Sequence, residues 1–311
     1  MISGFMIVKD VLGQGYPFVE AIASALPICD EFLVSDGYSS DGTYEVLEKI
    51  KALNPKVKLY RQQWPKKRTA NVLTTVTNEV RRKCRFEYIF SVQANEIVHE
   101  DSVPFIKALP RMLPYAETFS FPYLQLLNRY KLTEEFRLRF SKNLPSIEAI
   151  GDGWTLGTSK AFERKKKLRA IANPKRLFGY VNNGIWHTYA NSGYGRHSRA
   201  FYLPKPMFRY WSLFPTDFIK KYEKHWQLFQ ISSFQNSSEE LKENIRDPEK
   251  FWHLGAAALN KTLSKERPRY IEPYNSVEKK DHPAIIREFI SNPDADHYYV
   301  REEIFELLKK L

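Results

Sequence analysis

Cysteine is scarce in this chain, and the two cysteines that are present form no recognisable ligand or disulfide pattern. Cys29 and Cys84 lie far apart in a sequence of 311 residues and belong to no Cys-x-x-Cys or Cys/His motif. Small secreted folds and structural zinc sites depend on closely spaced cysteines. The sequence therefore argues against a disulfide framework and against a structural zinc site, and it fits a reducing compartment.

Long hydrophobic runs are also missing. No apolar stretch approaches the roughly 20 residues that a membrane-spanning helix needs. The opening residues 1–8 are apolar over the length of one strand, but they lack the basic start and the small-residue cleavage site of a signal peptide. We therefore expect a cytoplasmic protein that does not cross a membrane.

Acidic residues are outnumbered by basic ones. The chain has 36 Asp and Glu against 48 Lys and Arg, which gives a formal net charge of +12. This excess favours anionic partners. It is concentrated in residues 61–85 and 160–176, and runs of this kind are commonly solvated surface. Nucleotide phosphates, nucleic acid and an anionic membrane surface are therefore three open alternatives for the partner.

The first third of the chain alternates short apolar runs with amphipathic helical patterns. Strands are predicted at residues 5–8, 32–34, 57–60 and 88–92, and helices at 17–26, 43–53, 70–80 and 102–113. This alternation predicts an α/β fold, with a mainly parallel sheet flanked by helices on both faces.

Beyond residue 110 the pattern changes twice. Strand-like runs first appear at residues 119–126, 136–140 and 200–203, separated by loops that contain glycine and basic residues. Helical patterns then follow at residues 217–230, 239–245, 251–263, 283–290 and 301–308. We therefore predict one domain over residues 1–210, with halves at 1–110 and 111–210, and a mostly helical C-terminal extension over 211–311.

Three of the predicted strands end in polar residues. Asp10 follows the first strand, Asp36 the second, and the segment Gln93-Ala-Asn95-Glu96 the fourth. Because the carboxyl ends of parallel strands meet at one edge of a sheet, where α/β proteins bind ligands, we expect these side chains to converge on one site.

The turn that begins at Ser35-Asp36 is the most informative of these strand ends. It reads Ser-Asp-Gly-Tyr-Ser-Ser-Asp-Gly-Thr, and its backbone amides lie beside the predicted start of a helix, a combination that suits a phosphate. Helix capping explains Asp41 and Thr43 equally well. It does not explain why Asp36 stands directly at the end of an apolar strand.

Together, these three segments resemble the motifs of family 2 glycosyltransferases with the GT-A fold, which has a Rossmann-like sheet. In that family, roughly Asn-Glu ends the first strand, V-D-x-G-S-T-D-G-T forms the second turn, and D-A-D-E follows the fourth strand. Here Lys9-Asp10, the turn 35–43 and the segment 93–96 occupy those places. The resemblance covers residues 1–110, is loose over 111–210 and is not claimed beyond them. It implies a nucleotide-sugar half at 1–110 and an acceptor half at 111–210.

The resemblance implies a nucleoside-diphosphate sugar, a UDP- or GDP-sugar, as donor. By position, Asp10 and Asp36 would hold the nucleoside, and Gln93 and Asn95 would line the donor site. Arg68, in a basic loop, is a candidate for the diphosphate, because a guanidinium pairs with two phosphate oxygens at once. A solvated loop arginine is the alternative for Arg68.

The chain departs from the family at the metal position. The family's last D-x-D carboxylate binds a divalent cation that neutralises the leaving diphosphate. Here Gln93 and Asn95 carry amides, which bind hard cations more weakly. One reading is that Glu96, with Asn95 and His187, holds Mn²⁺ or Mg²⁺. The other readings are a site that relies on Arg and Lys instead, a chain that no longer transfers sugar, and a His187 that is merely packed.

An inverting transfer needs a general base opposite the donor. Asp152, between Gly151 and Gly153, is the predicted base, and Glu148 is its substitute. The flanking glycines allow close approach to a ligand. An ordinary turn aspartate is the alternative for Asp152.

The sequence therefore predicts an inverting glycosyltransferase that transfers a sugar to a hydroxyl on a glycan or a lipid-linked saccharide. Two alternatives stay open: transfer to nucleic acid, for instance a modified base, and a non-catalytic nucleotide-sugar-binding protein on a decayed transferase scaffold. Nucleotidyltransfer is disfavoured, because Gly13-Gln-Gly15 is too short for a phosphate loop. The aromatic stretch 201–214 is predicted to be core rather than an acceptor wall or a peripheral membrane contact.

Overall fold

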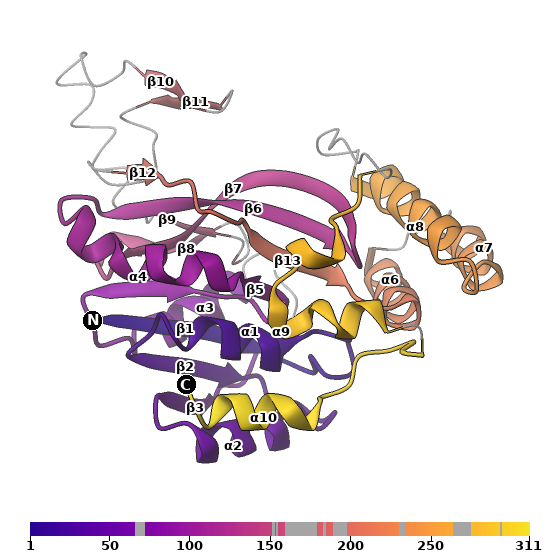
Figure 1. Cartoon of the computed structure of the whole chain (residues 1–311), viewed down its shortest axis with the longest axis horizontal. Coiled ribbons are helices and arrows are strands. Elements are labelled where there is room, and N and C mark those ends of the chain that lie inside the picture. The colour runs from indigo at the N-terminus through magenta and orange to yellow at the C-terminus, as the bar shows by residue number, and fades with distance from the viewer. Residues whose placement is uncertain are drawn as a thin grey trace.

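A computed structural model describes residues 1–65, 72–150, 153, 155–158, 179–182, 185–188, 198–229, 234–263, 275–292 and 294–311. Its centre is a nine-stranded mixed sheet with the order β3-β2-β1-β4-β7-β6-β13-β5, and β12 pairs with β6 beside that path (Figure 1). Helices flank the sheet, so the predicted α/β class with a mainly parallel sheet is confirmed.

The parallel half of the sheet comes from the first ninety residues. Its strands are β1 (Ile2–Val8), β2 (Glu31–Asp36), β3 (Val57–Arg61) and β4 (Tyr88–Ser91). The connecting helices are α1 (Phe18–Ala25), α2 (Thr43–Leu53) and α3 (Val72–Arg81). In register, Val8 lies beside Asp36 and Phe5 beside Ser91, so the carboxyl ends of β1, β2 and β4 share one edge.

The second half of the sheet is mixed. It contains β5 (Glu96–Val98), β6 (Thr118–Leu127), β7 (Tyr130–Lys142), β12 (Ser198–Ala200) and β13 (Met207–Ser212). Between β5 and β6 lie the 3-10 turn η1 (Glu100–Ser102) and α4 (Val103–Met112). Two small hairpins stand outside the main sheet: β8 (Ile147–Ile150) with β9 (Thr155–Thr158), and β10 (Gly179–Asn182) with β11 (Ile185–Thr188).

Two predictions for this half were wrong in detail, and one strand was missed. β7 is much longer than the predicted strand at 136–140, and the predicted strand at 200–203 continues no further than Ala200. β5 was not predicted at all. It has only three residues and depends on antiparallel pairing with Met207 to Arg209, a contact between distant segments that leaves no local pattern.

After β13 the described chain is helical. It contains α6 (Pro215–Phe229), α7 (Phe234–Glu243), α8 (Pro248–Leu263), η3 (Lys279–Asp281), α9 (Ala284–Arg287), η4 (Phe289–Ser291) and α10 (Glu302–Leu308). β13, a strand of the main sheet, includes residues on both sides of position 210. The division into residues 1–210 and 211–311 stays a prediction.

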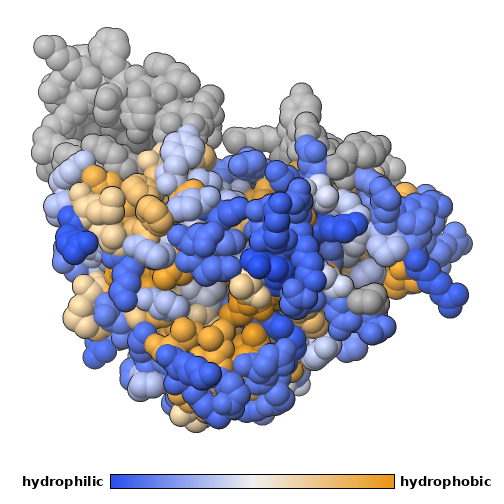
Figure 2. All heavy atoms as spheres, viewed as in Figure 1, coloured by the Kyte–Doolittle hydropathy of each residue, from blue (hydrophilic) through white to orange (hydrophobic). Residues whose placement is uncertain are grey.

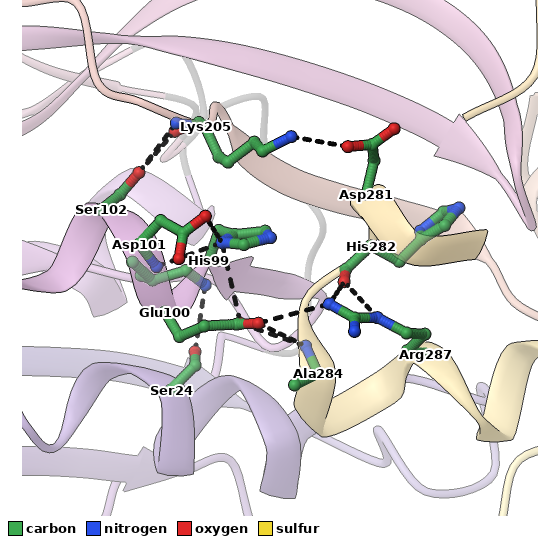
Figure 3. Close-up of polar contacts among 11 residues, drawn as sticks. Ser24, His99, Glu100, Asp101, Ser102, Lys205, Asp281, His282, Ala284 and Arg287 are labelled. Carbon is green, nitrogen blue, oxygen red and sulfur yellow. Dashed lines mark hydrogen bonds and ion pairs between the residues drawn. The ribbon is translucent and has the colours of Figure 1, made fainter. Parts of the chain in front are cut away.

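The C-terminal segment lies across the sheet and its first helices. Figure 1 shows α10 beside α2, and the Asn54 side chain donates to the Leu308 carbonyl at 2.9 Å. Further polar contacts join α9 to η1 (Figure 3): Glu100 accepts from the Ala284 N–H and pairs with Arg287 at 3.4 Å. The segment is therefore packed as part of the main body.

Apolar side chains from the whole described chain fill the core. The main cluster extends from Ile2 to Leu308, and a second cluster gathers around Phe218, Phe251 and Trp252. Phe208 and Tyr210 are buried in the main cluster, as predicted for the aromatic stretch, whereas Tyr202 of the same stretch is 64% exposed.

The surface of the molecule is mostly hydrophilic on the face drawn in Figure 2, and both cysteines are buried. Apolar colour shows over α4, where Phe105 and Met112 are exposed. Cys29 and Cys84 are both buried, and each is a free thiol. Of the helices in the described part of the chain, none has the length and apolar character needed to cross a bilayer.

Candidate functional site

Asp10 and Asp36 meet at the carboxyl edge of the sheet, joined by one serine. The Ser39 hydroxyl accepts a hydrogen bond from the Asp10 N–H at 2.8 Å. The Ser39 N–H donates to the Asp36 carboxylate, with both oxygens at 3.2 Å. The predicted convergence of these two strand ends is therefore present in the fold.

The loop that follows β1 is held in a strained conformation. Asp10 has a φ of 50°, in the left-handed region that costs a non-glycine residue about 1 kcal/mol. Its carboxylate accepts from the Ser40 N–H at 2.8 Å, and Gln14 Nε2 donates to the carbonyls of Lys9 and Asp10 at 2.9 Å each. Strain that the surroundings hold in place is common at functional sites.

Asp41 and Thr43 connect this loop to the turn after β2. Asp41 Oδ2 accepts from the Gly13 N–H at 2.6 Å, and Thr43 Oγ1 accepts from the Leu12 N–H at 3.1 Å. Asp41 Oδ1 also accepts from the Thr43 N–H at 3.0 Å, at the start of α2. Asp41 and Thr43 therefore hold the two loops together. The N-cap of α2 is Gly42, so neither Asp41 nor Thr43 is the helix cap that the alternative interpretation expected.

Arg61 covers the Asp36 carboxylate. Asp36 is fully buried, and Arg61 Nε donates to its Oδ2 at 3.2 Å. The guanidinium lies over the rings of Tyr38 and Tyr44, at 4.4 and 3.9 Å from their centroids. Tyr38 is 50% exposed, whereas Asp36 is buried beneath Arg61. A ligand that approaches Asp36 would therefore contact Tyr38 and Arg61 first.

Sequence reasoning missed Arg61, although a signal for it existed. Arg61 is the last residue of β3 and the register partner of Asp36. The rule that placed Asp10 and Asp36 at the sheet edge, namely that strand ends gather there, applies to Arg61 as well.

Gln93 and Asn95 follow β4 at the same edge, and each uses its amide nitrogen within the fold. Gln93 Nε2 donates to the Gly153 carbonyl at 3.3 Å. Asn95 Nδ2 donates to the Tyr210 carbonyl at 2.9 Å, and the Asn95 carbonyl accepts from the Tyr210 N–H at 2.9 Å. Asn95 is thereby fixed between the end of β4 and β13.

Glu96 lies beside them but faces a buried arginine. Its carboxylate pairs with the Arg139 guanidinium, whose Nη2 and Nε lie 2.5 and 2.9 Å from its two oxygens, and neither side chain is exposed. Tyr123 donates its hydroxyl to Glu96 at 2.5 Å. Burial alone would lower the pKa of Arg139, but the Glu96 carboxylate raises it above its ordinary value. The pair is therefore ionic.

Two further cations lie near the loop after β1. Lys221 is buried, donates to the Trp211 carbonyl at 2.5 Å and lies 4.2 Å from the ring centroids of Tyr16 and Trp211. Arg209 Nη1 donates to Gln125 Oε1 at 2.6 Å. Burial lowers the pKa of Lys221 well below its usual value, and the positive charge of Arg209 adds to this, while Asp217 opposes it. These cations come from β13 and α6, far along the chain from the motifs.

Several predicted site residues are not tested by these contacts. Arg68 and Asp152 lie outside the described residues, and His187 is described through its backbone alone, in β11 opposite Tyr180. Glu148 is half-buried in β8, close enough to Arg81 to act on its charge. The roles proposed for these four residues stay predictions.

The comparisons with known proteins are distant. No family model matches the chain, and no curated protein sequence matches it. In structure the chain is similar to S. aureus TarS, with a TM-score of 0.40 and 10% identity over 99% of this chain and 55% of TarS. The chain thus spans about half the length of TarS.

Two further similar structures contain nucleotide sugars. One is S. aureus TarS 1-349 in complex with UDP-GlcNAc, with a TM-score of 0.39 and 11% identity over 99% of this chain and 89% of that one. The other is the mannosyltransferase PcManGT from Pyrobaculum calidifontis in complex with GDP-Man and Mn²⁺. Its TM-score is 0.39 at 11% identity, over 85% of this chain and 75% of that one. Similarities this distant assign no activity to the chain.

Proposed function

We propose that this protein is an inverting glycosyltransferase that transfers a sugar from a UDP- or GDP-sugar to an acceptor hydroxyl. The observation that carries the proposal is the junction of Asp10 and Asp36 through Ser39, at the sheet edge where α/β proteins bind ligands. Gln93 follows the neighbouring strand β4 at the same edge.

The nucleoside is proposed to lie over Arg61 and Tyr38. The Tyr38 ring is exposed next to the buried Asp36, and aromatic rings stack on nucleobases with about 1–3 kcal/mol per base. Arg61 is held between Asp36 and the Tyr44 ring and is 35% exposed, so its position above Asp36 is fixed before a ligand arrives.

The proposed reaction is a single displacement at the anomeric carbon of the donor sugar. A carboxylate takes the proton of the acceptor hydroxyl, the hydroxyl oxygen attacks the anomeric carbon, and the nucleoside diphosphate leaves from the opposite face. Asp152 is the proposed base, with Glu148 as its substitute. The Gly153 carbonyl accepts from Gln93, which supports a base next to the donor site.

Titration calorimetry with UDP, GDP and their sugars tests the donor. We expect Tyr38→Ala to weaken nucleotide binding by about tenfold, which corresponds to the loss of one stacking contact. Tyr115→Ala, at an equally exposed tyrosine after α4, is the matched control and should bind as the wild type does. If no nucleotide binds the wild-type protein, the proposed function is rejected.

Transfer is tested separately from binding. Release of UDP or GDP in the presence of glycan or lipid-linked acceptors should be lost in Asp152→Asn, while donor binding is kept. Binding without any transfer would favour the non-catalytic alternative. The net charge of +12 favours the alternative of a nucleic-acid acceptor. If the acceptor is a nucleic acid, its affinity for the protein should fall steeply as the salt concentration rises.

A further inference from the structure

The carboxylate nearest to the predicted metal position has no lone pair left for a metal. Glu96 Oε1 accepts from the Tyr123 hydroxyl and from Arg139 Nη2, both at 2.5 Å. Glu96 Oε2 accepts from Arg139 Nε at 2.9 Å and from the Gln93 N–H at 3.1 Å. A carboxylate has about four acceptor sites, so these four hydrogen bonds use all of them.

The positions before Glu96 do not supply the missing charge. Gln93 and Asn95 are neutral, and both orient their amide nitrogens toward carbonyl oxygens of the fold. Three other carboxylates at this edge also accept hydrogen bonds within the fold: Asp10 from Ser40, Asp36 from Ser39 and Arg61, and Asp41 from Gly13. Throughout the described ranges, no three His, Cys, Asp or Glu side chains gather into a site that the protein alone could build around a metal.

A buried arginine lies beside Glu96 on the neighbouring strand. Arg209 on β13 is the register partner of Glu96 on β5, and its neighbour Tyr210 is bonded to Asn95. The Arg209 side chain is largely buried, with Nη1 bonded to the neutral amide of Gln125. Guanidinium groups bind phosphate oxygens through two parallel hydrogen bonds, which a small ammonium cannot do.

We propose that nucleoside-diphosphate binding to this protein requires no divalent cation. Arg139 takes the place of the metal as the counter-ion of Glu96, and Arg209 supplies the positive charge that faces the diphosphate. This inference rests on the proposed function and concerns the charge balance of the same site. The residues present do not fit a divalent metal at Glu96.

The test compares nucleotide binding with and without metal in the wild-type protein. UDP, GDP and their sugars are titrated by calorimetry in EDTA and again in Mn²⁺. We expect dissociation constants that agree within about threefold. Binding that appears only with Mn²⁺, or that Mn²⁺ tightens by about tenfold or more, overturns the inference and leaves the proposed function standing. No binding in either condition overturns the proposed function and the inference with it.

A second measurement tests Arg209 directly. Arg209→Gln should weaken nucleotide binding in EDTA by about tenfold or more, because it removes a charge-assisted hydrogen bond. Arg111→Gln, at an exposed arginine of α4, is the control and should leave binding unchanged. Thermal unfolding confirms that each variant is folded. Wild-type affinity in folded Arg209→Gln overturns the role given to Arg209.

Discussion

His282 should make the stability of this protein fall in mild acid. Its ring is fully buried between the C-terminal segment and the sheet, with Nδ1 2.8 Å from the Tyr210 hydroxyl (the ring is labelled in Figure 3). Its Nε2 is buried and has no hydrogen-bond partner among the described residues. Burial lowers the pKa of His282 from 6.5 to about 4, and the charges of Arg287 and Arg129 contribute to the lowering. The Val277 backbone and the charge of Asp281 oppose it.

The sign and size follow from the two pKa values. The unfolded chain takes up a proton near its ordinary pKa of 6.5, whereas the folded protein resists it until about 4. The stabilisation is therefore complete above 6.5 and is lost as the pH falls between the two values. At about pH 5 the loss is about 2 kcal/mol, and it approaches about 3 kcal/mol below pH 4.

Urea unfolding, followed by tryptophan fluorescence between about pH 7 and about pH 5, measures this loss. Other groups also change their protonation state over this pH range. Burial raises the pKa of Asp217 to about 6, so Asp217 costs stability as the pH rises, which opposes His282. The informative quantity is thus the difference between the wild type and His282→Gln. We expect the advantage of the wild type to shrink by about 2 kcal/mol over this range. A constant difference for His282→Gln would refute the reasoning.

Two further substitutions test the packing around the site. Glu96→Gln and Arg139→Met should each cost about 3–5 kcal/mol in urea unfolding, because each leaves a buried group without its partner, and a loss below about 1 kcal/mol would contradict the ion pair. Gly15→Ala should cost more than about 1 kcal/mol, because Gly15 has a φ of 67° and an added Cβ would lie 2.2 Å from the Asp217 carboxyl carbon. Gly13→Ala, where φ is not positive and the nearest atom is 3.3 Å away, is the matched control and should change stability by less.

The elements with strong local signals were predicted well. The helix at 43–53 has the predicted bounds, because Gly42 precedes it and Asn54-Pro55 ends it. The strands β1, β2 and β4 were found because they are short apolar runs buried on both faces. β7 was underestimated, because its charged residues, such as Glu135 and Arg137, pair with each other on the sheet and look like loop residues in the sequence.

Part of the candidate site could be predicted because its residues follow strands that have a clear apolar pattern. Asp10 and Asp36 follow apolar strands, and parallel topology alone brings their strand ends together. The partner of Glu96 is Arg139, 43 residues later, and nothing in the local sequence marks that contact. A motif position therefore indicated where Glu96 lies along the chain, but not which group its carboxylate faces.

The contact of α10 with the first helices has a consequence for synthesis on the ribosome. Asn54 and Leu308 are 254 residues apart, and their hydrogen bond joins one of the earliest segments to one of the latest. Apolar side chains of α1 that α10 covers therefore stay exposed until residues near 300 have left the ribosome. Contacts this distant slow folding and expose nascent chains to aggregation, so a truncation before α10 should accumulate in the insoluble fraction.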